Sequence, residues 1–242
     1  MTAPRADVVG SLLRPPELLD ARKAFESGQV SREDLTAAED RAVDDAIALQ
    51  EEAGLEVVTD GEMRRLSFQS QMTEAVEGFG EYGLDAFLWG EWRGGGEAGD
   101  LRIERPPSLG ATGKLRRKRF LSRDEFEYLK DRTSRTPKIT LPSPSLWVNF
   151  WSEERSGGAY PTLDGFLSDV VDILRDEVAE LVRLGATYIQ LDAPHYTALL
   201  DPGARAFYES RGWTAEKWLG QGIEMDNAVM EGFGEVTFGF HL

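Results

Sequence analysis

The sequence alternates between long stretches with apolar residues at three-to-four spacing and short, nearly unbroken apolar runs. The long stretches predict helices at 17–28, 31–54, 122–132, 162–185 and 214–232. Two of them open on a serine followed three residues later by an acid, Ser31 with Asp34 and Ser122 with Glu125, which predicts a capping box at each. The short runs predict strands at 6–11, 55–62, 138–145, 187–194 and 235–241.

The predicted strands end at nearly regular intervals, apart from one longer interval that leaves room for a sixth strand near 108–115. Long helices alternating with short buried strands are typical of βαβ units around a parallel sheet. We therefore expect residues 1–242 to form a single α/β domain, a TIM (β/α)8 barrel that is incomplete because only about the first six βα units fit. The Gly- and Pro-rich segment around 79–110 is predicted to be a loop insertion within that domain.

Polar residues follow each predicted strand at its carboxyl end. In a barrel these ends meet at one mouth, so side chains far apart in sequence are expected to face a common pocket. The residues concerned are Ser11, Asp60 and Glu62, Ser143 and Ser145, Asp192 and His195, and His241.

Each of these residues also has a structural interpretation. Asp60 before Gly61 is typical of a turn, and the two serines, Ser143 and Ser145, either cap the next helix or contact substrate. His195 lies beyond a strand tip, which favours a structural or solvent-exposed side chain. Asp192 is different, because a carboxylate directly after a buried strand is costly to desolvate unless a cation or a donor meets it. His241 ends a strand of the same kind, and together these positions favour a functional site.

Composition and charge narrow the class of protein. The net charge of −16, from 43 acidic and 27 basic residues, makes nucleic acid a poor partner, and the basic cluster at 114–119 is expected to be solvated. No apolar run is long enough to span a membrane, and the first residues lack the features of a signal peptide, so we expect a cytoplasmic protein. The absence of cysteine excludes disulfides and thiol nucleophiles within these residues.

Several carboxylates together with a histidine indicate either acid–base catalysis or a cationic substrate group with a metal. Neither a Walker nor a Rossmann phosphate loop is present in the sequence. The residues alone therefore predict a barrel enzyme with an acidic pocket.

The strand-end motifs resemble those of the cobalamin-independent methionine synthase family, in its catalytic C-terminal barrel and its shorter single-barrel relatives. The motifs are VGSLLRPPEL, GLEVVTDGEMRR, LPSPS, YIQLDAP and FGFHL, which occur here in the family's order and span nearly the whole chain. The resemblance implies a methyltransferase in which a zinc ion binds the thiol of homocysteine as a thiolate, which takes the methyl group of a methyltetrahydrofolate.

The resemblance also implies roles for individual residues. His241 matches the first zinc ligand, in a family pattern of His, any residue, Cys, so the chain is expected to stop just before its second ligand. Ser11 matches the position that holds the amino-acid carboxylate, Asp192 the acid that pairs with the ammonium, and Glu62 a further acid of the pocket. The expected catalytic residues are Glu62 and Asp192, and the expected substrate-binding set adds Ser11, Arg14 and Ser145.

Two alternatives stay open, because this chain reads Asp-Ala-Pro at 192–194 where the family's methionine synthases usually read Asp-Glu-Pro. One is zinc-dependent alkylation of another thiol, as in the coenzyme M transferase that acts on epoxides, for which Arg14 would bind a sulfonate. The other is an inactive fragment. A homo-oligomer or a complementing C-terminal segment is expected as a partner, because an open sheet exposes unpaired edges.

Overall fold

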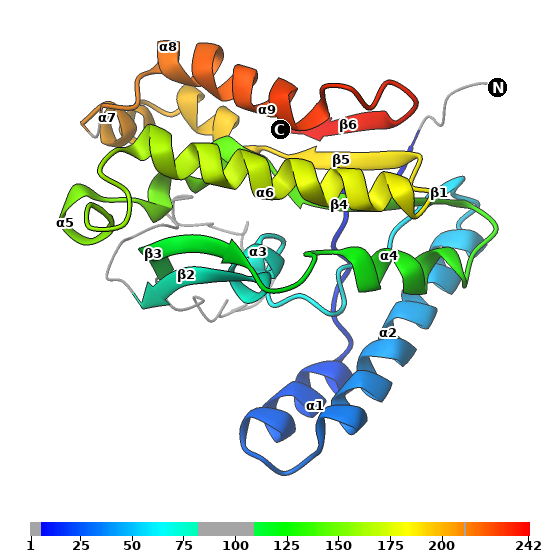
Figure 1. Cartoon of the computed structure of the whole chain (residues 1–242). Helices are drawn as coiled ribbons and strands as arrows, with labels where there is room; N and C mark the ends of the chain where they lie inside the picture. Colours follow the sequence, from blue (N-terminus) through cyan, green and yellow to red (C-terminus); the bar gives the residue numbers. More distant parts are fainter. Residues whose placement is uncertain (1–5, 82–108, 211) are drawn as a thin grey trace.

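The computed structural model describes residues 6–81, 109–210 and 212–242, and its centre is a parallel β-sheet flanked by helices (Figure 1). Within this part of the chain the sheet has four strands in the order β1-β4-β5-β6. These strands are β1 (Val57–Val58), β4 (Thr136–Pro142), β5 (Tyr188–Asp192) and β6 (Thr237–His241). All neighbours in this sheet are parallel, which confirms an α/β fold with a parallel sheet.

Helices connect these strands and cover the sheet. Preceding β4 in the chain are α1 (Pro16–Glu26), α2 (Arg32–Glu52), α3 (Ser70–Ala75) and α4 (Arg123–Lys130). Following β4 are a 3-10 helix η1 (Pro144–Phe150), α5 (Glu153–Ser156) and α6 (Leu163–Arg183). Following β5 are a second 3-10 helix η2 (Pro194–Leu200), α7 (Pro202–Ser210), α8 (Ala215–Lys217), the π-helix η3 (Trp218–Gly222) and α9 (Ile223–Met230).

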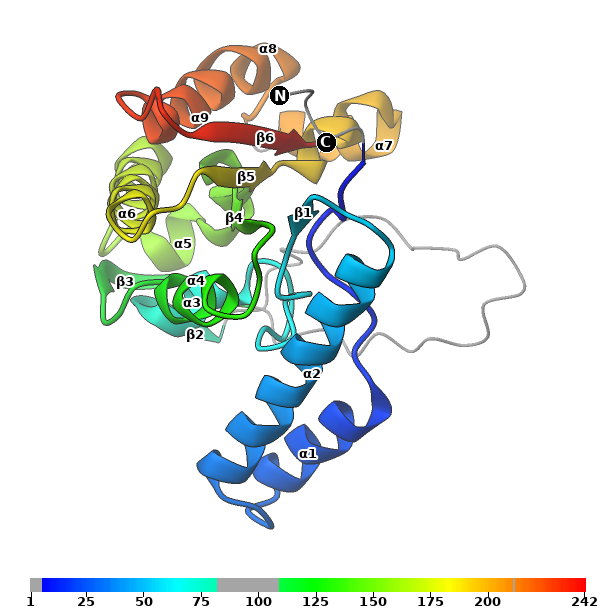
Figure 2. The same ribbon diagram turned by 90° about the vertical axis from the view of Figure 1, so that its right-hand side faces the viewer.

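The five predicted helices are confirmed, and two of them begin at the residue that the sequence indicates. Ser31 caps α2 in a full capping box with Asp34, and the Thr162 hydroxyl accepts from the backbone of Gly165 at the start of α6. Helix α6 runs alongside β4 and β5 (Figure 1), and its buried apolar residues recur at helical spacing, which gives it one buried face. In contrast, α1 and α2 form a pair that projects away from the sheet (Figure 2).

The predicted strand at 6–11 is wrong, because side chains take the backbone groups that a neighbouring strand would pair. The carbonyls of Val8, Val9 and Gly10 accept hydrogen bonds from the side chains of Lys138, Gln190 and Thr59, respectively. The predicted strand at 55–62 is cut to two residues for a similar reason. The Gln50 side chain accepts from the Thr59 N–H and donates to the Thr59 carbonyl, in place of a strand.

The predicted sixth strand exists but does not belong to the parallel sheet. Strand β3 (Leu109–Arg117) pairs antiparallel with β2 (Val76–Glu81) in a separate two-stranded sheet. The described residues therefore hold four parallel strands and a hairpin, not six βα units. Most of the loop insertion predicted around 79–110 lies outside the described residues, and no described helix has the length and apolar character needed to span a membrane.

Candidate active site

The turn after β1 places Glu62 at the carboxyl edge of the sheet. Asp60 Oδ1 accepts the backbone N–H of Glu62 at 2.9 Å, which confirms the predicted turn. Gly61 and Glu62 both have positive φ, at 68° and 55°. A glutamate rarely adopts this left-handed conformation, and such backbone strain is concentrated at functional sites.

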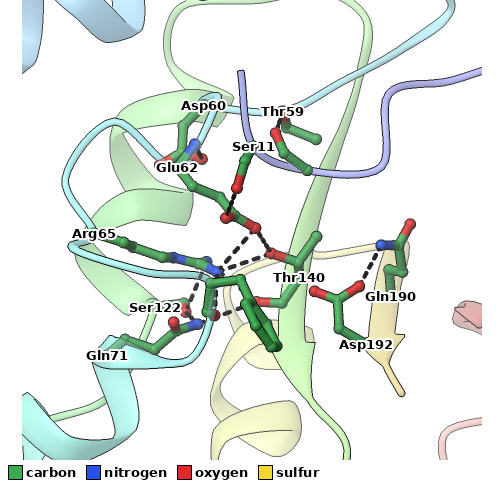
Figure 3. Close-up of polar contacts among 12 residues, drawn as sticks. Ser11, Thr59, Asp60, Glu62, Arg65, Gln71, Ser122, Thr140, Gln190 and Asp192 are labelled. Atoms are coloured by element: carbon green, nitrogen blue, oxygen red, sulfur yellow. Dashed lines mark hydrogen bonds and ion pairs between the residues drawn. The ribbon is translucent and has the colours of Figure 1, made fainter. Parts of the chain in front are cut away.

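The Glu62 carboxylate is buried and receives three different donors (Figure 3). Ser11 Oγ donates to Oε2, Thr140 Oγ1 donates to Oε1 at 2.6 Å, and Arg65 Nη1 lies 3.3 Å from Oε1. Burial on its own would raise the pKa of Glu62, but Arg65 and the hydroxyl donors outweigh it and lower the pKa below the ordinary value. The carboxylate is therefore ionised at neutral pH.

Glycine is required at position 10 for this arrangement. A Cβ at Gly10 would lie 2.6 Å from Glu62 Oε1 and 2.9 Å from Thr140 Cγ2. The close approach of the N-terminal segment to the Glu62 carboxylate brings Ser11 within hydrogen-bonding distance of it.

The buried guanidinium of Arg65 joins Glu62 to α4. Arg65 Nη2 lies 2.8 Å from Glu125 Oε2, and its other donors reach the hydroxyl and the carbonyl of Thr140. The predicted capping box at Ser122 is wrong, because Glu125 pairs with Arg65 and the Ser122 hydroxyl accepts from Arg65 and Gln71 instead of capping the helix. Tertiary ion pairing overrides the local pattern here.

Asp192 lies across Thr140 from Arg65, at the end of β5 (Figure 3). Its Oδ1 accepts from Gln190 Nε2 at 2.7 Å and lies 3.3 Å from His241 Nδ1 at the end of β6. Burial, with the nearby charge of Glu62, raises the pKa of Asp192 to about 6. Because desolvation disfavours the charged form, a cationic ligand group would stabilise this carboxylate.

A further acid contributes to the negative character of the site. Asp60 Oδ2 is buried without a hydrogen-bond partner, and burial together with the charge of Glu125 raises the pKa of Asp60 to about 7. Arg65 is buried among Asp60, Glu62 and Glu125, and the partly buried Arg14 also acts on Glu62 and Asp60. Together with Asp192, the acids outnumber these two arginines, which favours a cationic group on the ligand.

The structure brings four predicted site residues to one edge in two contacting pairs. Ser11 contacts Glu62, and His241 contacts Asp192, while the Glu62 charge acts on Asp192. Arg14 lies beside them, but its Nε and Nη2 donate to the backbone carbonyls of Arg65 and Glu62. The ligand-binding roles of these residues stay predictions.

Ser145 belongs to a second buried cluster, which follows the carboxyl end of β4 and is tied to β5 by the bond from the Ser143 N–H to the Asp192 carbonyl. Ser145 Oγ lies 2.8 Å from His195 Nε2, and Ser143 Oγ donates to Asp226 Oδ1 at 2.6 Å. Tyr196 donates to the other oxygen of Asp226 at 2.9 Å. His195 is buried rather than solvent-exposed, and burial lowers its pKa to about 3, so it is a neutral imidazole.

Sequence patterns missed several residues that hold the site together: Arg65, Thr140, Lys138 and Gln190. Each is a polar residue inside or next to an apolar run, and Gln190 lies two residues before Asp192, on the same face of β5. A search for polar residues at alternate positions of buried strands would have found Thr140, Lys138 and Gln190.

A zinc site is not complete within the described residues. No group of three or more His, Cys, Asp or Glu lies close enough to hold a metal ion among residues 6–81, 109–210 and 212–242. Within the part of the chain that the structure describes, the His241 imidazole has one acidic neighbour, Asp192, whereas catalytic zinc takes about three protein ligands. These residues alone do not fit the metal.

A cavity of about 660 Å³ lies on the other side of Arg65, between α1, α2 and α4. Its lining mixes arginines such as Arg22 and Arg64 with acids such as Glu39 and Asp124. Neither Asp192 nor His241 lines it, so it is separate from the edge described above.

Comparison with protein families gives one match over most of the chain. Residues 4–223 match the family described as "Cobalamin-independent synthase, Catalytic domain". Among similar proteins, YxjH of Bacillus subtilis, described as uncharacterized, is 28% identical over 217 residues, which is 89% of this chain and 52% of that protein. The methionine synthase of Sulfolobus acidocaldarius is 30% identical over 188 residues, covering 77% of this chain and 50% of that protein. The chain thus spans about half the length of these relatives.

Two solved structures share the fold. A candidate vitamin-B12 independent methionine synthase from Listeria monocytogenes aligns with a TM-score of 0.71 and 21% identity, over 98% of this chain and 64% of that one. A B12-independent methionine synthase from a Shewanella species, in complex with selenomethionine, aligns with a TM-score of 0.63 and 17% identity, over 88% and 54% of the two chains.

Proposed function

Because this chain belongs to the cobalamin-independent synthase catalytic domain family, we propose that it is part of an enzyme that transfers a methyl group to the thiol of homocysteine, forming methionine. The observation that carries the proposal is the pair of buried carboxylates, Glu62 and Asp192, at one edge of the sheet. The relative from Synechococcus that is named a 5-methyltetrahydropteroyltriglutamate–homocysteine methyltransferase is 31% identical over 77% of this chain and supports a methyl folate as donor.

Homocysteine carries an ammonium, a carboxylate and a thiol. The carboxyl edge of the sheet offers partners for the ammonium and the carboxylate. The Asp192 and Glu62 carboxylates would pair with the ammonium, since each is buried and the site has an excess of acids. The Ser11 hydroxyl would donate to the substrate carboxylate once it turns from Glu62. Binding at both ends would direct the thiol toward His241.

Zinc stays a proposal. His241 would supply one ligand, and the other ligands would have to come from outside the described residues, because those residues do not complete a site. We also propose that the four parallel strands are part of a (β/α)8 barrel, a proposal supported by the strand order and by the fold shared with the solved relatives.

No observation favours the coenzyme M alternative. A sulfonate would need a free cation, and two of the three guanidinium nitrogens of Arg14 are engaged by backbone carbonyls.

The test is an assay of the full-length gene product with homocysteine and 5-methyltetrahydrofolate, following methionine formation, with zinc content measured in the same sample. We expect turnover in the wild type, and a loss of about 100-fold or more in kcat/KM for Asp192→Ala, since a charge-assisted contact is removed. Ser156→Ala is the matched control, because it removes a buried hydrogen bond to Ala111 and touches none of the proposed site residues. Zinc-loaded protein that is inactive with several methyl donors would refute the proposal.

A further inference from the structure

A chain of polar contacts runs from β4 to β6 at the candidate site. Two hydrogen bonds join the fully buried Lys138 to Gln190 and Gln190 to Asp192, and Asp192 Oδ1 lies 3.3 Å from His241 Nδ1. Neither Lys138 nor Gln190 has a place in the proposed reaction. A buried lysine is costly unless its charge is compensated, so its contacts need an explanation.

The contacts of Lys138 account for its burial. Its Nζ lies 3.1 Å from Asp7 Oδ2, 2.5 Å from the Val8 carbonyl and 2.7 Å from Gln190 Oε1. An ammonium group has three N–H donors, and three oxygens meet them here. The lysine therefore fixes one end of the Gln190 amide, because only the amide oxygen can accept from an ammonium.

Because Lys138 holds the amide oxygen of Gln190, the amide nitrogen must point the other way. Its two N–H groups reach the Val9 carbonyl at 2.6 Å and Asp192 Oδ1 at 2.7 Å. The Gln190 amide does not need a fourth hydrogen bond to keep this orientation. One acceptor and two donors are enough to prevent it from flipping, and the reverse orientation would place the amide oxygen against the Asp192 carboxylate.

The fixed amide also fixes the carboxylate. Asp192 Oδ1 is held by Gln190 and His241, and no described residue donates to Oδ2. The carboxylate is buried, and Glu62 is close enough for its charge to act on it. Oδ2 is thus the oxygen left to accept a hydrogen bond from a ligand.

We propose that Gln190, oriented by Lys138, is a positioning residue that presents Asp192 Oδ2 to the ammonium group of an amino-acid substrate. The identity of that substrate as homocysteine rests on the proposed function. The positioning itself rests on the contacts of Lys138, Gln190 and Asp192.

A purely structural role predicts a different outcome from a positioning role. If Gln190 served only to tie the N-terminal segment at Val9 to the sheet, its loss would weaken every ligand equally. A positioning role predicts a loss confined to ligands that carry the ammonium group.

The experiment compares two ligands on the full-length protein by isothermal titration calorimetry. One is homocysteine, and the other is 4-sulfanylbutanoate, which keeps the thiol and the carboxylate but lacks the ammonium. Gln190→Met loses the whole amide and with it the donor to Asp192 Oδ1, and it adds no charge. We expect this variant to bind homocysteine about 10-fold to 100-fold more weakly, with the affinity for 4-sulfanylbutanoate unchanged within about threefold.

Ser156→Ala again serves as the control for loss of a buried hydrogen bond, and it should alter neither affinity. Equal losses for the two ligands, or no loss for either, would overturn the proposal. Failure of the wild type to bind homocysteine would instead count against the proposed function.

Crystal structures of the wild type and Gln190→Met test the positioning without any ligand. We expect the Asp192 carboxylate to turn in the variant and to lose its contact with His241 Nδ1. An Asp192 side chain that keeps the wild-type orientation would overturn the proposal.

Discussion

Replacing Arg65 with methionine should strip the candidate site of its buried counter-charge. Arg65 is 2% exposed and lies between two carboxylates, with Nη1 3.3 Å from Glu62 Oε1 and Nη2 2.8 Å from Glu125 Oε2. It also donates to the hydroxyl and the carbonyl of Thr140 at 2.8 and 3.1 Å. Methionine has a similar length but supplies none of these donors.

The expected loss of stability is large, because Glu62 and Glu125 stay buried without the guanidinium that pairs with both. Removing one partner of a buried ion pair costs about 3–5 kcal/mol. We expect about 4 kcal/mol at pH 7.5, the middle of this range, which lowers Tm by roughly 8–16 °C in a domain of this size.

The loss should also depend on pH. In the wild type Glu62 has a lowered pKa, so its contribution to stability is present above the ordinary glutamate pKa and is lost only as pH falls through the lower, folded-state value. In Arg65→Met, Glu62 loses the cation that most lowers its pKa and keeps Arg14 and the two hydroxyl donors, so its pKa rises relative to wild type. The stability penalty should therefore be greatest at pH 7.5 and shrink toward pH 5.

The assay is urea unfolding followed by tryptophan fluorescence at several pH values. Arg116→Met is the matched control, because Arg116 pairs with Glu77 at 3.0 Å on the surface, with side-chain exposures of 81% and 48%. It should change stability by less than about 1 kcal/mol. A loss at Arg65 as small as that of the control, or one that does not vary with pH, would refute the reasoning.

Four further outcomes are expected. Burial raises the pKa of Asp226 from 3.8 to about 6. The contribution of Asp226 to the free energy of unfolding is therefore fully present below pH 3.8 and is lost as pH rises through 6. Asp226→Asn should accordingly be more stable than wild type at pH 8 but not at pH 4, as thermal melts would show. His195 has a pKa lowered from 6.5 to about 3, so stability should fall as pH drops below 6.5, and less steeply in His195→Gln. Ser31→Ala breaks the capping box of α2 and should lower Tm by about 2–4 °C in differential scanning calorimetry. Residues 1–242 expressed alone should associate or aggregate, since β6 is an edge of the described sheet and Phe240 is 42% exposed, whereas a stable monomer in size-exclusion chromatography would contradict this.

The sequence predicted the helices well because their signals are local. Ser31 and Thr162 cap their helices as the pattern indicates. The helix predicted at 214–232 is present but is interrupted by the π-helix at Trp218–Gly222, and α7 was missed. Strands β4, β5 and β6 were found because each is a short, largely apolar run, although β6 is partly exposed where the pattern predicts a buried strand.

The failures come from partners that no local pattern reveals. An extended segment at 6–11 resembles a strand in sequence, but its carbonyls are taken by Lys138 and Gln190, which lie more than a hundred residues away. Ser122 and Glu125 satisfy the spacing of a capping box, but Arg65 provides a stronger partner for the acid. The placement of the candidate residues at strand ends could be predicted. Of the residues that orient them, Thr140, Lys138 and Gln190 need a search for polar residues at alternate strand positions, and Arg65 has no such signal.

The most direct test of the account is the crystal structure of the full-length protein with homocysteine bound. The account predicts the ammonium nitrogen about 2.7–3.2 Å from Asp192 Oδ2 and beside Glu62, with the ligand carboxylate near Ser11. Homocysteine bound elsewhere, for example in the cavity between α1, α2 and α4, with no contact to either carboxylate, would contradict it.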